Sequence, residues 1–301
     1  MENETQHQEH HHHPEHKRGA LISRNNAMYI IVILAVLAIV LYYVLGTNHA
    51  IALDGQMVSA ADMQALQMAA SNSTLAGAVG VGSTANYPVV VASNAQLSAG
   101  SVKLTTNAQG VVTAIAADVK HLTIDGKPGI LYIGAEYCPY CAETRWGMIL
   151  ALMRFGNFTG LEYMSSTSTD VFPNSATFSF VNSSYSSPYI AFQSVEIQDR
   201  NGSALQTPTD FQGMLGSKFS TGGIPFIDFF NMSVQDGAAS SPQALAGQNW
   251  QQAIAQLDNP NSAVSQAVIG NANVFTAEIC KEANVSAAIC SAPYIKSISV
   301  S

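Results

Sequence analysis

The pattern of hydrophobic and polar positions begins with one long apolar run near the start of the chain. Residues 27–46 are 20 positions without a charged side chain, and a helix of that length extends about 30 Å, the thickness of the bilayer hydrocarbon. Lys17, Arg18 and Arg24 precede the run, and the next basic residue is Lys103. This asymmetry predicts a single transmembrane anchor at 27–46, with the N-terminus cytoplasmic and the C-terminal domain extracytoplasmic.

The apolar run at 27–46 divides the rest of the chain into a segment before it and segments after it. A cleaved signal peptide is the alternative reading, with a small-residue site at 50–52, but the apolar run is longer than such a leader requires. Residues 1–26 form a His-rich tail, which composition alone makes either a divalent-metal binder or a solvated low-complexity segment. Residues 47–117 read as a linker and an N-terminal elaboration, and residues 118–301 as the principal domain.

Strand-like and helical patterns alternate in the principal domain. Residues 121–124 and 129–133 read as two strands joined by a turn, and a helical pattern runs from Cys141 to Phe155. Further strands are predicted at 161–164, 189–198 and 224–230, and further helices at 210–219, 248–257, 261–269 and 274–283. Strands that alternate with helices predict an α/β domain.

Composition narrows the function classes. Apolar residues make up 48% of the 301 positions, enough to bury a sizeable core. The formal net charge is −8, from 12 basic and 20 acidic residues, and this balance excludes a basic nucleic-acid-binding surface. Nucleic acid is therefore not expected as a partner.

The most informative segment is Cys138-Pro139-Tyr140-Cys141, placed where a buried strand runs into a helix. The N-terminus of a helix favours negative charge, so Cys138 there should ionise more readily than a free cysteine. Pro139 suits the first helical turn because it has no N–H to leave unpaired. Cys141 lies one turn further along the helix and points inward. The spacing predicts Cys138 as a nucleophile and Cys141 as a resolving thiol.

Two segments carry a resemblance to a known family. Residues 134–141, GAEYCPYC, resemble the active-site segment of thioredoxin-fold oxidoreductases, and Gly223-Ile224-Pro225-Phe226 is similar to the cis-proline loop that faces the dithiol in that fold. The resemblance implies that Pro225 shapes a substrate loop and that the Ile224 backbone contacts the substrate. Tyr140 and Trp146 are further candidates for the substrate groove, although a core position is the alternative for Trp146.

A second resemblance is more specific. GAEYCPYCAETRWGMILALMRFG, TDVFPNSATFSF, SSPYIAFQSVEIQDRNG and GGIPFIDFFN resemble domain of unknown function 929, a mostly archaeal family of membrane-anchored proteins, over roughly residues 119–290. The resemblances together imply a thioredoxin-like α/β fold preceded by one transmembrane helix. It would carry an insertion at about 168–220, between the CxxC helix and the cis-proline loop, and a helical C-terminal extension.

The sequence departs from the thioredoxin pattern at its proton acceptor. Many thioredoxins have a buried acid six residues before the first cysteine, where this chain has Tyr132. Glu136 and Glu143 are near the dithiol but are expected to be exposed, and Arg145 is expected on a solvated face. No acceptor for the Cys141 proton is therefore identified in the sequence.

The other two cysteines have a structural interpretation. Cys280 and Cys290 are expected to form a disulfide, with a second redox pair as the alternative. A structural disulfide or a zinc site is the alternative for Cys138 and Cys141. Zinc is disfavoured because a second close pair of ligands is missing and His121 is isolated. No metal site is expected in the principal domain.

These observations predict a membrane-anchored, extracytoplasmic thiol–disulfide oxidoreductase that acts on protein thiols or disulfides of exported proteins. No cofactor is expected, because the dithiol itself carries the electrons. The alternative is a redox-inert thioredoxin-fold adaptor that binds surface partners through the inserted region.

Overall fold

The computed structural model describes residues 24–90, 121–219 and 223–300. Its contacts divide the chain into two units, residues 1–43 and 44–301. Nearly all of the predicted His-rich tail at 1–26 and the later part of the predicted elaboration at 47–117 lie outside the described residues.

The first described element is helix α1 (Arg24–Leu53), in which the side chains of residues 28–41 are exposed. In the described part of the chain, no helix has both the length and the apolar character needed to cross a membrane. A span requires about 20 consecutive, predominantly apolar residues in one helix. The prediction of a transmembrane anchor at 27–46 is therefore wrong.

The main sheet is built around one buried strand, β3. It pairs in parallel with β8, in antiparallel with β9, and at its beginning with the short strand β2. The antiparallel hairpin of β9 and β10 extends the sheet, and β1 closes that edge. The strands of this sheet are β1 (Val89–Val90), β2 (Thr123–Ile124), β3 (Lys127–Gly134), β8 (Ala191–Glu196), β9 (Phe226–Phe229) and β10 (Ser233–Asp236).

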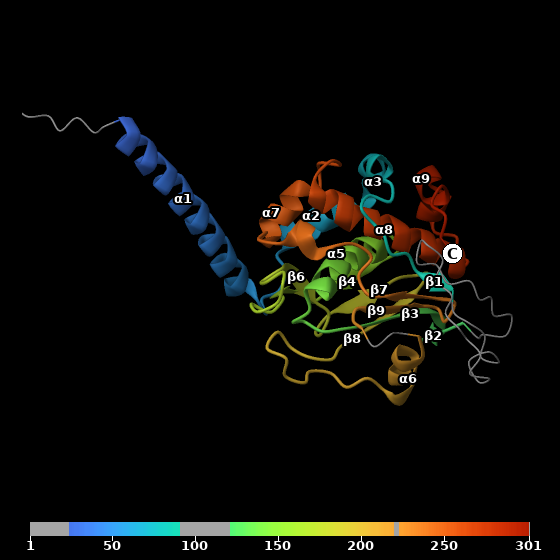
Figure 1. The fold of residues 1–301 in the computed structure, drawn as a ribbon. Coiled ribbons are helices and arrows are strands. Elements are labelled where there is room, and N and C mark those ends of the chain that lie inside the picture. The colour runs from blue at the N-terminus through green and yellow to red at the C-terminus, as the bar shows by residue number, and fades with distance from the viewer. Residues whose placement is uncertain (1–23, 91–120, 220–222, 301) are drawn as a thin grey trace, which may run out of the picture. The chain divides into compact units, whose positions relative to one another are not determined.

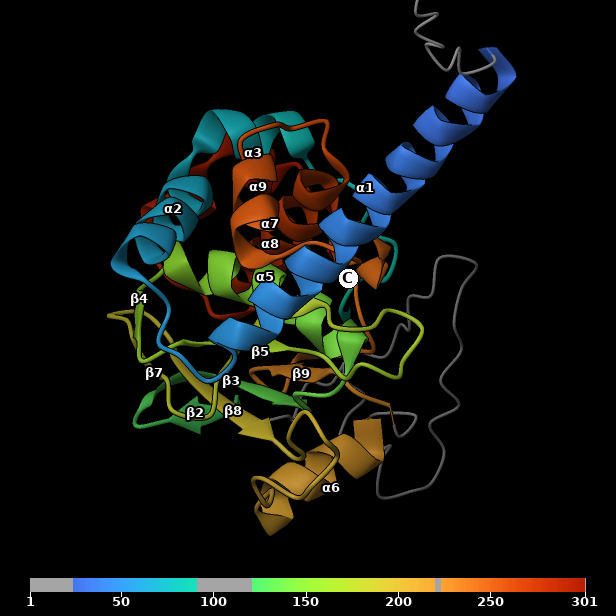
Figure 2. The same ribbon diagram turned by 90° about the vertical axis from the view of Figure 1, so that its left-hand side faces the viewer.

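Helices cover both faces of this sheet. Helices α5 and α8 pack together on one face with the shorter helices around them, and α6 lies on the opposite face (Figures 1 and 2). The helices are α2 (Ala60–Ser71), α3 (Ser73–Val79), α5 (Pro139–Met153), α6 (Asp210–Phe219), α7 (Trp250–Gln256), α8 (Ala263–Glu282) and α9 (Pro293–Lys296), with 3₁₀ turns η1 (Pro242–Leu245) and η2 (Ala288–Ser291). The prediction of a mixed α/β architecture is confirmed.

Two small two-stranded sheets lie between α5 and β8 in the sequence. Strand β4 (Asn157–Thr159) pairs with β7 (Ser184–Ser186), and β5 (Glu162–Ser165) pairs with β6 (Ala176–Ser179), both in antiparallel. The chain thus adds a four-strand segment between two strands that are neighbours in the main sheet. The loop between β5 and β6 lies beside the start of α5, because the Thr167 N–H donates to the Tyr137 carbonyl at 2.9 Å.

The two faces of the sheet have separate cores. The larger core lies between the sheet and α5 and α8, and includes Trp146, Ile227 and Phe275, all fully buried. The smaller core lies under α6 and consists of Leu131, Ile133, Val195, Leu215, Phe226 and Val234. Alternate residues of β3 and β9 enter opposite cores, as the period of two in a strand requires.

Helix α8 is one continuous element where the sequence pattern predicted two, at 261–269 and 274–283. Asn271 and Asn273 interrupt the apolar pattern, but both are fully buried and hydrogen-bonded to other segments of the chain. Gly147 of α5 lies against this stretch, and a Cβ there would approach the Asn271 Cβ to 2.7 Å. The absence of a side chain at Gly147 therefore permits the close contact between the two helices.

Candidate active site

Cys138 lies where β3 passes into α5. It is the N-cap residue of α5, and Pro139 is the first residue of the helix. Its Sγ accepts a hydrogen bond from the Cys141 backbone N–H at 3.2 Å. This bond satisfies one of the N–H groups that a helix start leaves unpaired, so the sequence folds locally in a way that directs the sulfur toward backbone donors.

The two thiols have opposite electrostatic environments. The pKa of Cys138 is lowered by the hydrogen bond from the Cys141 thiol, by the Cys141 backbone N–H and by the charge of Arg145, while burial opposes the shift. The pKa of Cys141 is raised well above its ordinary value because the side chain is fully buried and its hydrogen bond with Cys138 holds the proton. The arrangement therefore suits one nucleophilic sulfur and one sulfur that stays protonated until later.

The residues before β9 bring a third component to the dithiol. The Ile224–Pro225 peptide bond is cis, and the Ile224 carbonyl accepts a hydrogen bond from the Cys138 Sγ at 3.9 Å. Pro225 is buried and Ile224 is partly exposed. Cys138 and Cys141 are free thiols and form no disulfide in this structure. Tertiary structure therefore places Ile224, 86 residues beyond Cys138, and the adjoining Pro225 opposite that cysteine.

Exposure around the dithiol is confined to a few side chains. The exposed fraction is 5% for Cys138 and zero for Cys141, whereas Tyr140 is 42% exposed. The Tyr140 ring makes an edge contact with Phe172, from the loop between β5 and β6, at a centroid distance of 6.1 Å. Tyr140 is the single residue of α5 that is not buried. It is the predicted substrate-contacting side chain that the structure leaves accessible beside Cys138.

A hollow borders the same loop. It has a volume of about 420 Å³ and is lined by polar side chains, among them Tyr137, Thr167, Asp170, Gln198 and Arg200. Tyr137 directly precedes the first cysteine, and the Glu136 N–H donates to the Gln198 carbonyl at 2.9 Å. The hollow is therefore lined in part by the loop that carries Cys138. The sequence analysis did not predict it.

Trp146 does not belong to this surface. It is fully buried, its Nε1 donates to the Ala176 carbonyl at 2.9 Å, and its ring packs edge-on against Phe178. The sheet covers one side of α5 and α8 covers the other. The surface of α5 around Trp146 is therefore not available to line a substrate groove. The prediction that Trp146 lines the substrate groove is therefore wrong, and the alternative of a core position is correct.

This position leads to a testable expectation. Trp146→Ala should lower the free energy of unfolding by about 3–5 kcal/mol, because a large buried aromatic is removed, and urea unfolding measures the change. Thiol reactivity per folded molecule should be unchanged. Trp146→Phe should lose less stability. A stable Trp146→Ala protein with impaired thiol reactivity would instead place this ring at the site.

Arg145 is buried, contrary to the expectation of a solvated face. Its Nε and Nη2 donate to the two carboxylate oxygens of Glu196 at 2.8 and 2.7 Å, and Nη2 also donates to the Ala135 carbonyl at 2.7 Å. Glu196 is at the end of β8, in register with Gly134 at the end of β3. The guanidinium carbon lies 5.9 Å from the centre of the Tyr132 ring. An ion pair with no exposure thus lies directly behind the dithiol.

Glu136 and Glu143 were predicted to be exposed, and both are buried. Glu136 accepts a hydrogen bond from the Ser179 hydroxyl at 2.6 Å. Glu143 accepts hydrogen bonds from the Ser240 hydroxyl at 2.7 Å and from the Asn271 amide, and burial raises its pKa to about 8. The groups that donate these hydrogen bonds lie on β6, in the loop after β10 and on α8, so the sequence around each glutamate carried no signal of them.

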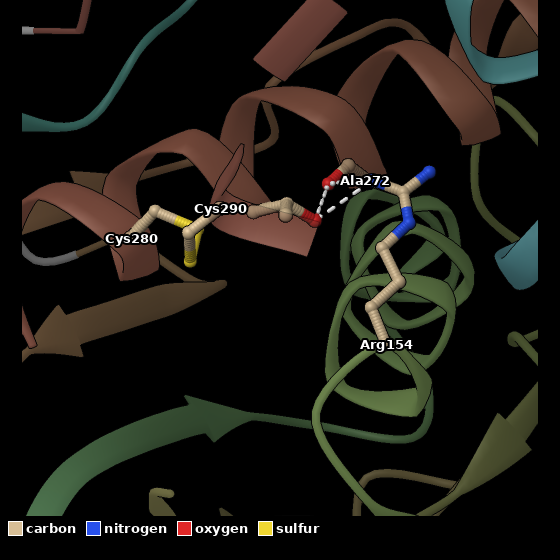
Figure 3. Close-up of a disulfide and its surroundings, with 5 residues drawn as sticks. Arg154, Ala272, Cys280 and Cys290 are labelled. Carbon is tan, nitrogen blue, oxygen red and sulfur yellow. Dashed lines mark hydrogen bonds between the residues drawn. A yellow bond between two sulfur atoms is a disulfide. The ribbon is translucent and has the colours of Figure 1, made fainter. Parts of the chain in front are cut away.

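Cys280 and Cys290 form a disulfide that ties the end of α8 to η2, with a Cα–Cα distance of 5.3 Å. Figure 3 shows it beside the stretch of α8 where Arg154 donates to the Ala272 carbonyl at 3.1 Å. In the chain-entropy relation, a closed loop of this size stabilises a fold by about 3 kcal/mol. The pair is remote from Cys138 in sequence and belongs to the C-terminal helices.

Metal binding has no support in the described part of the chain, where no group of three or more His, Cys, Asp or Glu side chains could hold an ion. The His-rich tract at 7–16 lies outside the described residues. His121, which the sequence analysis considered as a ligand, has an exposed side chain.

The comparisons with known proteins concern the segment that contains the dithiol. Residues 114–214 match the family model of a domain of unknown function (DUF929), which confirms that resemblance over these residues. The match includes Cys138, Cys141, Arg145 and Glu196. Ile224 and Pro225 lie beyond it. No curated protein and no solved structure matches the chain significantly.

Proposed function

We propose that this protein is a thiol–disulfide oxidoreductase that exchanges electrons with protein disulfides through Cys138 and Cys141. The observation that carries the proposal is the asymmetry of the dithiol. The Cys138 sulfur accepts an N–H bond at the start of α5 and faces the Ile224 carbonyl, while Cys141 is sealed behind it. A structural pair of cysteines needs neither a lowered pKa nor a partner loop across from it.

The exchange runs in two steps. The Cys138 thiolate attacks one sulfur of a substrate disulfide, so a mixed disulfide forms and the first substrate thiolate leaves and takes up a proton. Cys141 then loses its proton and attacks the Cys138 sulfur, so the intramolecular disulfide forms and the second substrate thiol leaves. The protein gives up two electrons and two protons to the substrate, and the reverse sequence oxidises a substrate dithiol.

The topology supports a thioredoxin-like arrangement. Strands β3 and β8 are parallel and flank the connection through α5, and the antiparallel pair β9–β10 continues the sheet on the other side of β3. Helices α5 and α8 lie on one face and α6 on the other (Figure 1). This is the order of elements that the resemblance to thioredoxin-fold oxidoreductases implies, with β4–β7 as the added segment.

The second cysteine pair supports an extracytoplasmic site of action. A disulfide such as Cys280–Cys290 persists in oxidising compartments and is rare in the cytosol. Exported or surface proteins with disulfides or thiols are therefore the proposed substrates. The exposed Tyr140 ring and the cis bond at Pro225 border the nucleophile, and we propose that they contact the substrate segment.

Trapping in cells tests the function. The Cys141→Ser variant of the full chain should accumulate mixed disulfides through Cys138, visible as slower bands on a non-reducing gel after thiol blocking and lost on reduction. The matched control is the double variant Cys138→Ser and Cys141→Ser, which should form none.

The same experiment separates the redox-inert adaptor. If the double variant retains partner binding at wild-type level and Cys141→Ser traps nothing, the adaptor reading replaces the proposal. Mass spectrometry of the trapped species names the substrates.

A further inference from the structure

The ion pair behind the dithiol is placed to act on Cys141. Arg145 follows Cys141 by four residues on α5, a spacing at which side chains lie on the same face of a helix, one turn apart. The guanidinium has no exposed surface, and its two bonds to Glu196 and one to the Ala135 carbonyl hold it in a single orientation. Ala135 belongs to the loop that carries Cys138, so the same contacts connect Arg145 to both cysteines.

One nitrogen of the Arg145 guanidinium makes no hydrogen bond to the described residues. The Arg145 Nη1 is buried and has no hydrogen-bond partner within the described residues. The same is true of the hydroxyl of Tyr132, whose ring centre lies 5.9 Å from the guanidinium carbon. Leaving a buried donor unpaired destabilises the fold, and the cost is larger for a charged group. Such a cost at a residue otherwise held by three hydrogen bonds is expected where the donor gains a partner during the reaction.

The reaction supplies such a partner. In the resolving step Cys141 must become a thiolate without reaching solvent, and a buried anion is strongly disfavoured unless a positive charge is near. Given the proposed function, we infer that Arg145, held in place by Glu196, is the positioning residue whose buried charge stabilises the Cys141 thiolate. It touches no substrate and acts through that sulfur.

The other groups around Cys141 do not cancel this charge. The electrostatic influences on Cys141 come from Cys138 and Arg145 on its own helix and from Glu196 on β8. Tyr132, on β3, is uncharged because burial raises its pKa well above the ordinary value. A charged Cys138 raises the pKa of Cys141 by more than Arg145 lowers it, but in the resolving step Cys138 is part of a mixed disulfide and carries no charge. Of the two charges that remain, that of Arg145 has a larger effect on the pKa of Cys141 than that of Glu196. The net field of the pair therefore favours the thiolate.

A small disulfide reagent separates the two steps. With DTNB, attack by Cys138 releases one thionitrobenzoate and leaves the second attached, and attack by Cys141 on the Cys138 sulfur releases that second one. Each release is an absorbance change, so the first phase reports Cys138 and the second phase reports Cys141. The measurement uses the reduced, full-length protein.

The first test removes both charges together, because an isolated buried partner would destabilise the fold. In the double variant Arg145→Met and Glu196→Met, the second phase should slow about 10-fold or more at pH 7, and its pH midpoint should rise, since a tenfold change in thiolate fraction corresponds to one pKa unit. Arg145→Lys, which retains the charge, should stay close to the wild-type rate. Glu196→Gln retains the cation without its counter-charge, so it should speed the second phase.

Arg154→Met is the matched control. Arg154 is partly buried and lies at the other end of α5, about 20 Å along the helix from Cys141, where it donates to the Ala70 and Ala272 carbonyls. Its loss should reduce stability without moving the pH midpoint of the second phase.

The outcomes are distinct. An unchanged second phase in a folded double variant overturns the role of Arg145. If that variant does not fold, an unchanged or slower second phase in Glu196→Gln overturns it instead. Failure of the first phase in wild-type protein would contradict the proposed function itself.

Discussion

Cys138→Ser is expected to reduce thiol–disulfide exchange to the background rate, a loss of about 1000-fold or more, because removing the attacking atom leaves no other route through the site. Cys141 cannot substitute, since it is fully buried and its pKa is raised well above the ordinary value. The rate is measured with DTNB and with a protein disulfide such as insulin. In Cys141→Ser the first attack should remain and turnover should stop.

The pH dependence of labelling examines the same asymmetry. A lowered pKa at Cys138 means that a larger thiolate fraction is present at neutral pH, so iodoacetamide should label it with a midpoint below that of an ordinary cysteine. Cys141 should be labelled only after unfolding. Equal labelling of both cysteines in the native protein, or an ordinary midpoint for Cys138, would contradict the proposed division of roles.

Glu143→Gln is expected to stabilise the protein at neutral and alkaline pH. Burial raises the pKa of Glu143 from 4.5 to about 8. Below pH 4.5 the carboxyl is protonated in the folded and unfolded states alike, and its pKa shift has no effect on stability. Between pH 4.5 and about 8 the unfolded state releases the proton and the folded state retains it, so unfolding becomes progressively easier.

The size of the effect follows from the shift. Each pKa unit corresponds to about 1.4 kcal/mol, so at pH 7 the substitution should raise the free energy of unfolding by about 3 kcal/mol. The amide retains the size of the carboxyl and an oxygen that accepts from Asn271. Urea unfolding of both proteins at pH 4 and pH 8 measures the change, with near-equal stability at pH 4 as the internal control.

Other buried acids leave part of the pH dependence in place. Asp54, Asp228 and Glu278 also have pKa values raised by burial, to about 6, 7 and 7. Glu143→Gln should therefore remove a share of the loss of stability with rising pH and not the whole. A variant that is less stable than wild type at pH 8 would contradict a protonated, burial-dominated Glu143.

The local structure at the dithiol could be predicted because its causes are local. Cys138 is the N-cap of α5, and Pro139 and Cys141 lie in its first turn, where the spacing of three residues and the chemistry of an N-cap decide the geometry. Helix α6 was predicted at 210–219 and runs over those residues, and strand β9 falls within the predicted 224–230. Such elements follow from short periodic patterns.

The surroundings of the dithiol could not be predicted in this way. The structure buries 14 of the 15 residues of α5, because the sheet and α8 cover opposite sides of the helix. The pattern of α5 alone therefore could not separate a core face from a solvated one at Glu143, Arg145 or Trp146. Local composition was also insufficient at residues 27–46, where the apolar run predicted a membrane span that the described helices do not support.

The sequence by itself determined that a pair of cysteines three residues apart begins a helix after a buried strand, since these features depend on neighbours within a few residues. Tertiary structure alone decided what faces and supports that pair. The Ile224 carbonyl, the Glu196 carboxylate and the hydrogen-bond donors to Glu143 come from segments 51 to 128 residues away from their partners. Their positions depend on strand pairing and helix packing, which bring together side chains that no local pattern connects.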